Sequence, residues 1–394
     1  MRVVLTRRES IESPDGVSIF IVSLAQALCE LGHEVKVIVG HLRSHSEYQR
    51  LLAPRLDLPI IALSNTPVSG FGSVIVWLHA KRIIDRFAPD LVIHSEAVPL
   101  QLRGTSIQVV HDLQRRQGPL APLWRIIRRF TAKRNDYVVA TTSELREELV
   151  RELGLSADSI PLIPKCIDRQ AYRSSKLTAR ERAIVHAGTS PYEDPGATIR
   201  AFGVLDDPSV RLYVVGALTA PTREAIDALP LRLRDRVELL GEVAGDVRRR
   251  LHSQVRVAAF PKHYTVPVAS ATVMEAIATG TPIIGSETLS RDVLVDGVNG
   301  IVVGTEPKGM AAAFKRLLND DKLWTRLSAG ASRMVKRFDA VVVAAEYIQL
   351  ASGSLLSPAP NGAGDSRTRS HTALPPDRLL HSTKKVAREI RTVG

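Results

Sequence analysis

The chain has 394 residues, of which 53 are Lys or Arg and 41 are Asp or Glu, so its formal net charge is +12. A hydrophobic content of 44% with 24% charged residues is ordinary for globular proteins and excludes a wholly disordered, collagen-like or coiled-coil chain. Two cysteines, Cys29 and Cys166, are too few for a disulfide framework, and no apolar run is long enough to span a bilayer. The segment that follows Met1 is too short for a secretory signal, so we expect a cytoplasmic protein.

The first 170 residues alternate short β-branched runs with helical patterns, which is typical of a parallel α/β sheet. Residues 3–6 predict a buried strand, and apolar spacing over residues 17–31 predicts a helix that Gly32 ends. Further strands of this series are predicted at 35–39, 91–94, 107–110 and 137–140.

A second series of the same kind begins after residues 176–182. Its strands are predicted at 184–188, 211–216, 237–241, 255–260 and 282–286. The fold class is therefore α/β, with two doubly wound Rossmann-like domains that face a cleft. The predicted boundaries are 1–170 for the first domain, 171–335 for the second, 336–352 for a helix that crosses back, and 353–394 for a flexible basic tail.

The tail carries 7 basic and 3 acidic residues, about a third of the net charge. Its Pro-, Gly- and Ser-rich beginning cannot bury enough apolar surface to offset the entropy of ordering. Residues 379–393 have the pattern of a short basic helix, which is compatible with a weak membrane contact or with a solvated tail.

Three segments carry residues suited to chemistry. Gly16 lies between the first strand and the first helix, where a glycine lets backbone N–H groups approach a phosphate at the helix N-terminus, although a plain loop explains it too. His111 follows the strand at 107–110 and can face a ligand at the carboxyl edge of the sheet, or serve a capping role. Glu275 opens a helix after the strand at 255–260, as an acceptor for sugar hydroxyls or as a helix-dipole partner.

Taken together, these segments resemble the GT-B glycosyltransferases, and within them the large retaining family 4, or group 1, type. The resemblance covers about residues 1–350 and rests on the order of its motifs. These motifs are Gly16–Ser18, Leu24–Leu28, Leu31–Val35, Pro89–His94, Val110–Asp112, Ala140–Glu144, Ile163–Pro164, Ile167–Asp168, Glu275–Ser286 and Asp296–Gly300.

The resemblance implies a retaining transferase that moves a sugar from a nucleotide-sugar donor in the second domain to a saccharide or lipid-linked acceptor on the first. It implies no metal and no cofactor, and the sequence has no Asp-x-Asp motif. His111 would contact the transferring sugar, and Glu275 would bind the donor ribose. The other implied donor-binding residues are Gly16, Gly188, Lys262, His263, Val268, Ala269, Ser270 and Ala271.

Several positions depart from the family pattern. Pro267 stands where the family has an acidic residue, and Thr189 and Asp194 stand where it has the Arg and Lys that bind the diphosphate. Asp15 replaces a glycine, and Lys165-Cys166 replaces Asn-Gly. Two hypotheses follow: Lys262, His263 or Lys165 supplies replacement charge in an active enzyme, or the chain is a catalytically impaired GT-B-like binding or partner protein. A weaker alternative is a nucleotide-sugar epimerase, which would turn over without an acceptor.

Residues 115–134 contain seven basic and no acidic residues, interleaved with Leu, Ile, Trp and Phe. Such a helix can lie on an anionic membrane, which would place the protein at the inner face of the membrane, or it can pack normally with a solvated basic face. No nucleic-acid-binding module is recognisable, so we expect no nucleic-acid partner.

Overall fold

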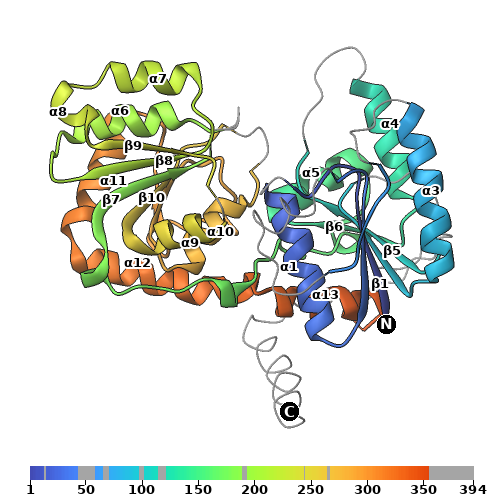
Figure 1. Cartoon of the computed structure of the whole chain (residues 1–394). Coiled ribbons are helices and arrows are strands. Elements are labelled where there is room, and N and C mark those ends of the chain that lie inside the picture. Colours follow the sequence, from blue (N-terminus) through green and yellow to red (C-terminus); the bar gives the residue numbers. More distant parts are fainter. Residues whose placement is uncertain are drawn as a thin grey trace, which may run out of the picture. The chain divides into compact units, whose positions relative to one another are not determined.

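The computed structural model describes residues 1–12, 15–42, 58–64, 71–96, 102–113, 121–188, 193–243, 245–263 and 267–354. Within these residues the chain forms two parallel sheets of six strands each, flanked by helices (Figure 1). This confirms the predicted class of two Rossmann-like α/β domains, which we call the first and the second lobe.

The first sheet has the strand order β3-β2-β1-β4-β5-β6, with every pair parallel. Its strands are β1 (Arg2–Arg7), β2 (Glu34–Val39), β3 (Ile60–Ala62), β4 (Leu91–His94), β5 (Thr105–Val110) and β6 (Tyr137–Ala140). The helices of this lobe are α1 (Gly16–Glu30), α3 (Phe71–Phe87), α4 (Ala121–Ala132) and α5 (Ser143–Leu153), followed by the short turn η1 (Ala157–Ser159).

Strand β1 shows why this sheet is buried on both faces. Val3 and Leu5 pack into the core beneath α1, whereas Val4 packs with Trp77 and Ile84 of α3 on the opposite face. Side chains alternate between the faces of a strand, so a run of apolar residues fills both cores at once. The strand's carboxyl end then falls at Arg7, directly before the loop that leads into α1.

The second sheet has the order β12-β11-β10-β7-β8-β9 and is also parallel. Its strands are β7 (Glu181–Ala187), β8 (Arg211–Val215), β9 (Val237–Gly241), β10 (Val255–Phe260), β11 (Ile283–Gly285) and β12 (Gly300–Val302). Its helices and preceding turns are η2 (Arg169–Ala171), η3 (Leu177–Ala179), α6 (Pro195–Leu205), α7 (Ala220–Asp227), α8 (Leu231–Arg234), α9 (Gly245–Gln254), α10 (Ala271–Ala278), α11 (Pro307–Asn319) and α12 (Asp321–Met334).

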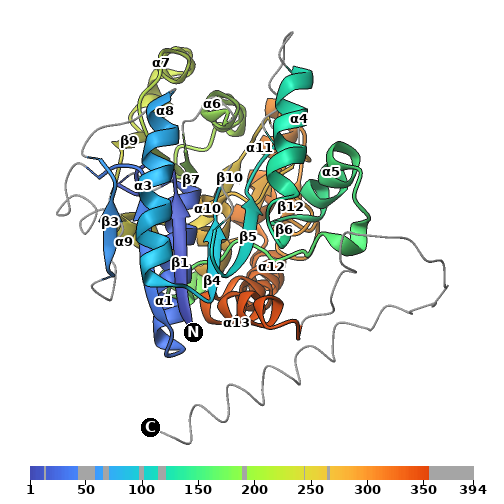
Figure 2. The ribbon, with the colours of Figure 1, turned by 90° about the vertical axis from the view of Figure 1, so that its right-hand side faces the viewer.

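After α12, the turn η4 (Val335–Phe338) leads to α13 (Ala340–Ala351), which packs in the first lobe beside α1 (Figures 1 and 2). Val343, Tyr347 and Leu350 of α13 are buried in the same core as Phe20 and Leu24 of α1. Helix α13 is therefore held to the first lobe by apolar burial, although it follows the second lobe in sequence. None of the helices within the described residues is long and apolar enough to cross a membrane.

Hydrogen bonds also join the lobes around the start of α5. The backbone N–H of Ser143 donates to Asp292 at 2.6 Å, and the Ser143 hydroxyl donates to the same carboxylate at 3.1 Å. Thr142, the residue that caps α5, donates from its hydroxyl to the Pro267 carbonyl at 3.3 Å. These bonds bring the loop before α10 to the carboxyl end of β6.

Buried histidines predict an acid-sensitive fold. Burial lowers the pKa of His94 to about 3 and the pKa values of His186 and His252 to about 4. Their unfolded values lie near 6.5, so below that pH the unfolded chain binds protons that the folded chain does not. We expect the free energy of unfolding to reach its highest value above about pH 6.5 and to fall steadily as the pH drops toward 4. Each buried histidine contributes about 1.4 kcal/mol for every unit by which its folded and unfolded pKa values differ.

Urea denaturation at a series of pH values measures this slope. His252→Leu is the informative variant, because neither ring nitrogen of His252 has a hydrogen-bond partner among the described residues. With this substitution, the free energy of unfolding should fall less steeply with decreasing pH than it does in the parent chain. A parent stability that is constant or rising from pH 7 to pH 5 would contradict the prediction.

Candidate active site

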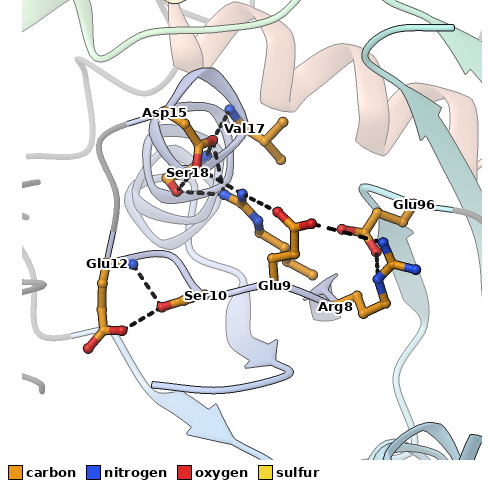
Figure 3. A network of polar contacts seen from close by, with 9 residues as sticks. Arg8, Glu9, Ser10, Glu12, Asp15, Val17, Ser18 and Glu96 are labelled. Carbon is orange, nitrogen blue, oxygen red and sulfur yellow. Dashed lines mark hydrogen bonds and ion pairs between the residues drawn. The ribbon is translucent and has the colours of Figure 1, made fainter. Parts of the chain in front are cut away.

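The N-terminus of α1 is closed by a carboxylate of the chain itself (Figure 3). Asp15 caps the helix and accepts hydrogen bonds from the N–H groups of Val17 at 2.8 Å and Ser18 at 3.0 Å. The buried Arg7 guanidinium holds the same carboxylate through two contacts, of 3.1 and 2.8 Å. Burial opposes ionisation of Asp15, but the charge and hydrogen bonds of Arg7 outweigh it and hold the pKa below its usual value. The departure from glycine at this position thus supplies a fixed internal anion at the helix end.

A second group of charges lies beside it, after β1 and β4. Arg8 contacts Glu96 at 3.3 Å and Glu9 at 3.9 Å (Figure 3). Burial raises the pKa of Glu96, the charge of Arg8 opposes this, and the charge of Glu9 adds to it. Because these groups stand at the carboxyl end of the first sheet, they are candidates for contact with a polar acceptor.

His111 follows β5 and is almost completely buried, with 5% of its surface exposed. Its ring meets the edge of the Phe20 ring, with centroids 4.9 Å apart. Neither ring nitrogen has a hydrogen-bond partner among the residues that the structure describes. Burial lowers the pKa of His111 well below its usual value, and the charges of Lys165 and Arg7 lower it further. A neutral imidazole with both nitrogens free is suited to bind a hydroxyl or ring oxygen of a ligand.

Lys165 brings a cation to the same place. A Cβ built on Gly16 would lie 3.9 Å from the Lys165 Nζ and 3.4 Å from the Cβ of Ala271, the first residue of α10. The helix N-termini of α1 and α10 therefore approach each other beside the ammonium group. Gly16 thus lies at this junction, but the Asp15 carboxylate already caps α1.

The ammonium of Lys262, which follows β10, forms an ion pair with Glu193 and donates to the Ser270 hydroxyl at 3.2 Å. Both charged side chains are nearly excluded from water. Burial lowers the pKa of Lys262, and the charge of Glu193 opposes the change. The structure therefore places Lys262 next to the start of α10, as expected of a donor-binding residue, but with a carboxylate already beside it.

Gly188 ends β7 with a backbone φ of +112°, a region that favours glycine. A Cβ at this position would lie within 2.4 Å of all three carboxyl atoms of Glu193. Glycine is therefore required for the Glu193 side chain to reach Lys262. His186 supports this turn, since its Nε2 lies 2.8 Å from the Gly188 carbonyl oxygen.

Asp194, at the position where the family pattern has a lysine, has a structural role as the cap of α6. Its carboxylate caps α6 by accepting from the Ala197 N–H at 2.8 Å, and it contacts Arg200 at 3.5 Å. His263 lies 3.2 Å from the other side of that carboxylate and is more than half exposed. The acid at this position is thus engaged by a helix end and two basic side chains. The position of Thr189 lies outside the described residues.

Glu275 is 1% exposed and lies on α10, where its carboxylate is held on both oxygens. Arg248 of α9 donates to it through Nε at 2.5 Å and Nη2 at 2.8 Å, and the Tyr172 hydroxyl donates at 3.0 Å. Burial opposes the charge, but Arg248 outweighs it and lowers the pKa of Glu275. The structure assigns Glu275 a role in holding α9, α10 and the turn after η2 together. Its contact with a donor ribose stays a prediction.

The loop that precedes α10 supplies backbone groups. Val268 and Ala269 are buried, and Ser270 is the residue before the helix, whose hydroxyl lies 2.9 Å from the Thr272 hydroxyl. No side-chain hydrogen bond caps α10. Its first N–H groups therefore point toward Gly16 and Lys165 as donors for an anion.

Several residues that hold the candidate site residues in place were not predicted from the sequence. Arg7, Glu193, Arg248 and Tyr172 all hold a site residue, yet each lies outside the motifs that carry the family resemblance. Arg248 stands in a run of three arginines, and only the packing of α9 on α10 distinguishes it from Arg249 and Arg250. In the part of the chain described here, no three His, Cys, Asp or Glu side chains gather as a metal site.

Two parallel six-stranded lobes of this topology form the GT-B fold, and the buried His111 lies after a strand of the first sheet. Residues 14–171 match the family model described as Glycosyltransferase Family 4, and residues 181–320 match the one described as Glycosyl transferases group 1. The chain belongs to this family of glycosyltransferases and is an enzyme of that class.

Curated relatives share this class. A GDP-mannose-dependent alpha-(1-6)-phosphatidylinositol dimannoside mannosyltransferase of Mycobacterium tuberculosis is 25% identical over 350 residues, covering 81% of this chain and 88% of the relative. A phosphatidyl-myo-inositol mannosyltransferase of Mycolicibacterium smegmatis is 25% identical over 386 residues, covering 89% and 93%. A D-inositol 3-phosphate glycosyltransferase of Xylanimonas cellulosilytica is 32% identical over 229 residues, covering 52% and 54%.

Solved structures share the fold. A glycosyltransferase from Rickettsia africae superposes with a TM-score of 0.71 at 14% identity, covering 91% of this chain and 99% of that one. The Anabaena protein HepE, in complex with UDP, superposes with a TM-score of 0.70 at 16% identity, covering 90% and 100%.

Proposed function

We propose that this enzyme moves a sugar from a nucleotide-diphosphate sugar to a saccharide or lipid-linked acceptor, with retention of the anomeric configuration and without a metal or cofactor. The observation that carries the proposal is His111, a buried neutral histidine whose two nitrogens have no partner among the described residues. It stands beside Lys165, which in turn faces the uncapped start of α10. A sugar at His111 and a diphosphate at α10 would be adjacent.

The proposed chemistry requires stabilisation of the charge that develops on the departing nucleoside diphosphate. The first N–H groups of α10 supply fixed dipoles, and Lys165 supplies positive charge beside them. Preorganised donors of this kind lower a barrier because they need no rearrangement as charge develops. The complex of HepE with UDP, on the same fold, supports a nucleotide ligand.

The acceptor is proposed to lie on the first lobe, near Glu96 and Arg8, where charged groups stand at the carboxyl end of β4. Relatives named as phosphatidylinositol mannosyltransferases and inositol phosphate glycosyltransferases favour an acceptor with an inositol-like or lipid-linked hydroxyl group. A role in glycolipid biosynthesis follows from that choice of acceptor.

A transfer assay tests the proposal. The purified chain is incubated with labelled GDP-mannose or UDP-glucose, with and without phosphatidylinositol or inositol 3-phosphate. We expect label to enter the acceptor, with NMR showing the donor's anomeric configuration in the product and EDTA leaving the rate unchanged. Donor conversion that needs no acceptor would favour an epimerase, and absence of binding to every nucleotide sugar tried would favour a binding protein.

We further propose that α4 docks the enzyme on an anionic membrane surface. Ile126 and Phe130, one helical turn apart, are 62% and 53% exposed. Arg134 stacks over the Phe130 ring at 4.1 Å, and Arg129 and Lys133 are exposed nearby. Apolar anchors flanked by cations suit the boundary between lipid headgroups and acyl chains. Residues 115–120 of the predicted basic segment lie outside the described residues, as does the tail from residue 355.

The variant Phe130→Glu should reduce co-sedimentation with phosphatidylglycerol vesicles severalfold, because it removes the anchor and adds a negative charge at an anionic surface. Leu231→Glu is the matched control, since Leu231 is 75% exposed on α8 of the second lobe and lacks flanking aromatic anchors. Pelleting that is equal for the two variants, or equal with neutral vesicles, would argue against docking through α4.

A further inference from the structure

The basic side chains near the start of α10 in the second lobe are already paired with carboxylates of the chain. Lys262 is paired with Glu193, and His263 lies against Asp194. Neither group therefore brings a free positive charge to the start of α10. A diphosphate carries more negative charge than helix dipoles alone balance, so the site needs a further cation.

Lys165 meets this need. It follows the short parallel bridge between Ala140 and Leu162, which directs the chain from the first sheet toward α10. The residue is 6% exposed, and among the described residues the charged groups that act on its ammonium, Asp112, Asp15 and Lys262, form no ion pair with it. Burying a lysine without a paired anion is costly, because burial removes much of the hydration of the ammonium group. Such a group indicates a position that a ligand completes.

The ammonium group points at the meeting place of two helix ends. The position of a Cβ on Gly16 lies 3.9 Å from the Lys165 Nζ and 3.8 Å from the backbone nitrogen of Ala271. The amide of Ala271 belongs to the first turn of α10, which no side chain caps. The lysine and the helix dipole of α10 therefore act on the same small region.

The surrounding charges agree with this placement. Burial lowers the pKa of Lys165, the charges of Asp112 and Asp15 oppose the change, and Lys262 lowers it further. Asp15 is engaged by Arg7 and the α1 amides, and Asp112 is exposed. An anion at the open start of α10 would offset the cost that burial and the charge of Lys262 impose on the Lys165 ammonium.

We propose that Lys165, from the first lobe, binds a diphosphate oxygen of the nucleotide-sugar donor and replaces the cations that this chain lacks in the second lobe. This inference rests on the proposed function. The donor would then contact both lobes, because α10 is a helix of the second lobe and Lys165 lies in the first. The lysine then also stabilises the charge of the departing nucleoside diphosphate during transfer.

Calorimetry on the full chain tests the inference. UDP and GDP are titrated into the parent protein, and the one that binds is compared with its nucleoside. Lys165→Met should weaken binding of the diphosphate at least tenfold and leave nucleoside binding unchanged, since the lost contact is with phosphate alone. Lys165→Arg should retain most of the affinity. Lys322→Met, on the exposed side of α12, is the matched control.

The outcomes separate two failures. If the parent binds neither diphosphate, the proposed function and this inference both fall. If the parent binds but Lys165→Met binds equally well, the inference falls and the proposed function stands. Should Lys165→Met not fold, Lys165→Gln keeps a polar side chain without charge, and the same tenfold loss is expected. Equal affinity of Lys165→Gln and parent overturns the inference.

Discussion

Replacing His111 with alanine should lower kcat for sugar transfer by about 10²–10³-fold, the usual cost of removing one preorganised group that meets a transition state. The ring is fixed by burial and by its edge contact with Phe20, so its free nitrogens are oriented before substrate arrives. The thermal midpoint should fall through the lost packing against Phe20, although no hydrogen bond is broken, so kcat is measured below the variant's unfolding transition.

His94 supplies the control for this prediction. It is buried at the end of the neighbouring strand β4, but its Nδ1 is engaged with the Thr6 hydroxyl at 2.8 Å. His94→Asn should leave kcat within a few-fold of the parent, although it will affect stability. Steady-state kinetics with a defined donor and acceptor measure both variants. A His111→Ala enzyme with unchanged kcat would remove His111 from the mechanism.

The protonation state of His111 adds a pH criterion. Burial keeps the pKa of His111 well below its usual value, so the imidazole stays neutral throughout the neutral range. The parent's kcat should therefore not fall between pH 8 and pH 6 through protonation of this residue. A loss of activity over that range that is absent in His111→Gln would contradict a neutral His111.

Replacing Arg248 with methionine should destabilise the enzyme by about 3–5 kcal/mol, since it leaves the Glu275 carboxylate buried without its counter-charge. Both charged groups are nearly inaccessible, at 8% and 1% side-chain exposure, so solvent cannot substitute for the lost partner. The double variant Arg248→Met with Glu275→Leu should recover much of the loss, because an apolar pair of similar volume replaces a desolvated ion pair.

The contribution of Glu275 to the pH dependence of stability should reverse in sign in Arg248→Met. In the parent, Arg248 holds the pKa of Glu275 below its unfolded value, so the pair stabilises the fold above about pH 4.5 and is lost as the pH falls further. Without Arg248, burial raises that pKa, and stability should increase as acid protonates Glu275. Urea denaturation of parent and variant measures this at pH 5 and 7. A variant less stable at pH 5 than at 7, relative to the parent, would refute the assignment.

The sequence predicted both sheets because parallel strands buried on two faces read as continuous β-branched runs. It did not predict β3 and β12, which are three residues long and lie at the sheet edges. Short edge strands carry too few residues for a pattern, and neighbours along the sheet stabilise them instead. Burial of α13 against α1 likewise depends on a contact between the two ends of the described chain.

Residue types and strand ends in the sequence determined the class of this protein and placed His111, Gly16 and Glu275 near the carboxyl edges of the sheets. Tertiary structure alone decided which charges are engaged. It pairs Lys262 with Glu193 and Glu275 with Arg248, and it makes Asp194 the cap of α6. Among the described residues, it leaves the buried Lys165 without an ion-pair partner. The physical reason is that a side chain's charge is set by groups within a few ångströms, and these come from segments that are distant in the sequence.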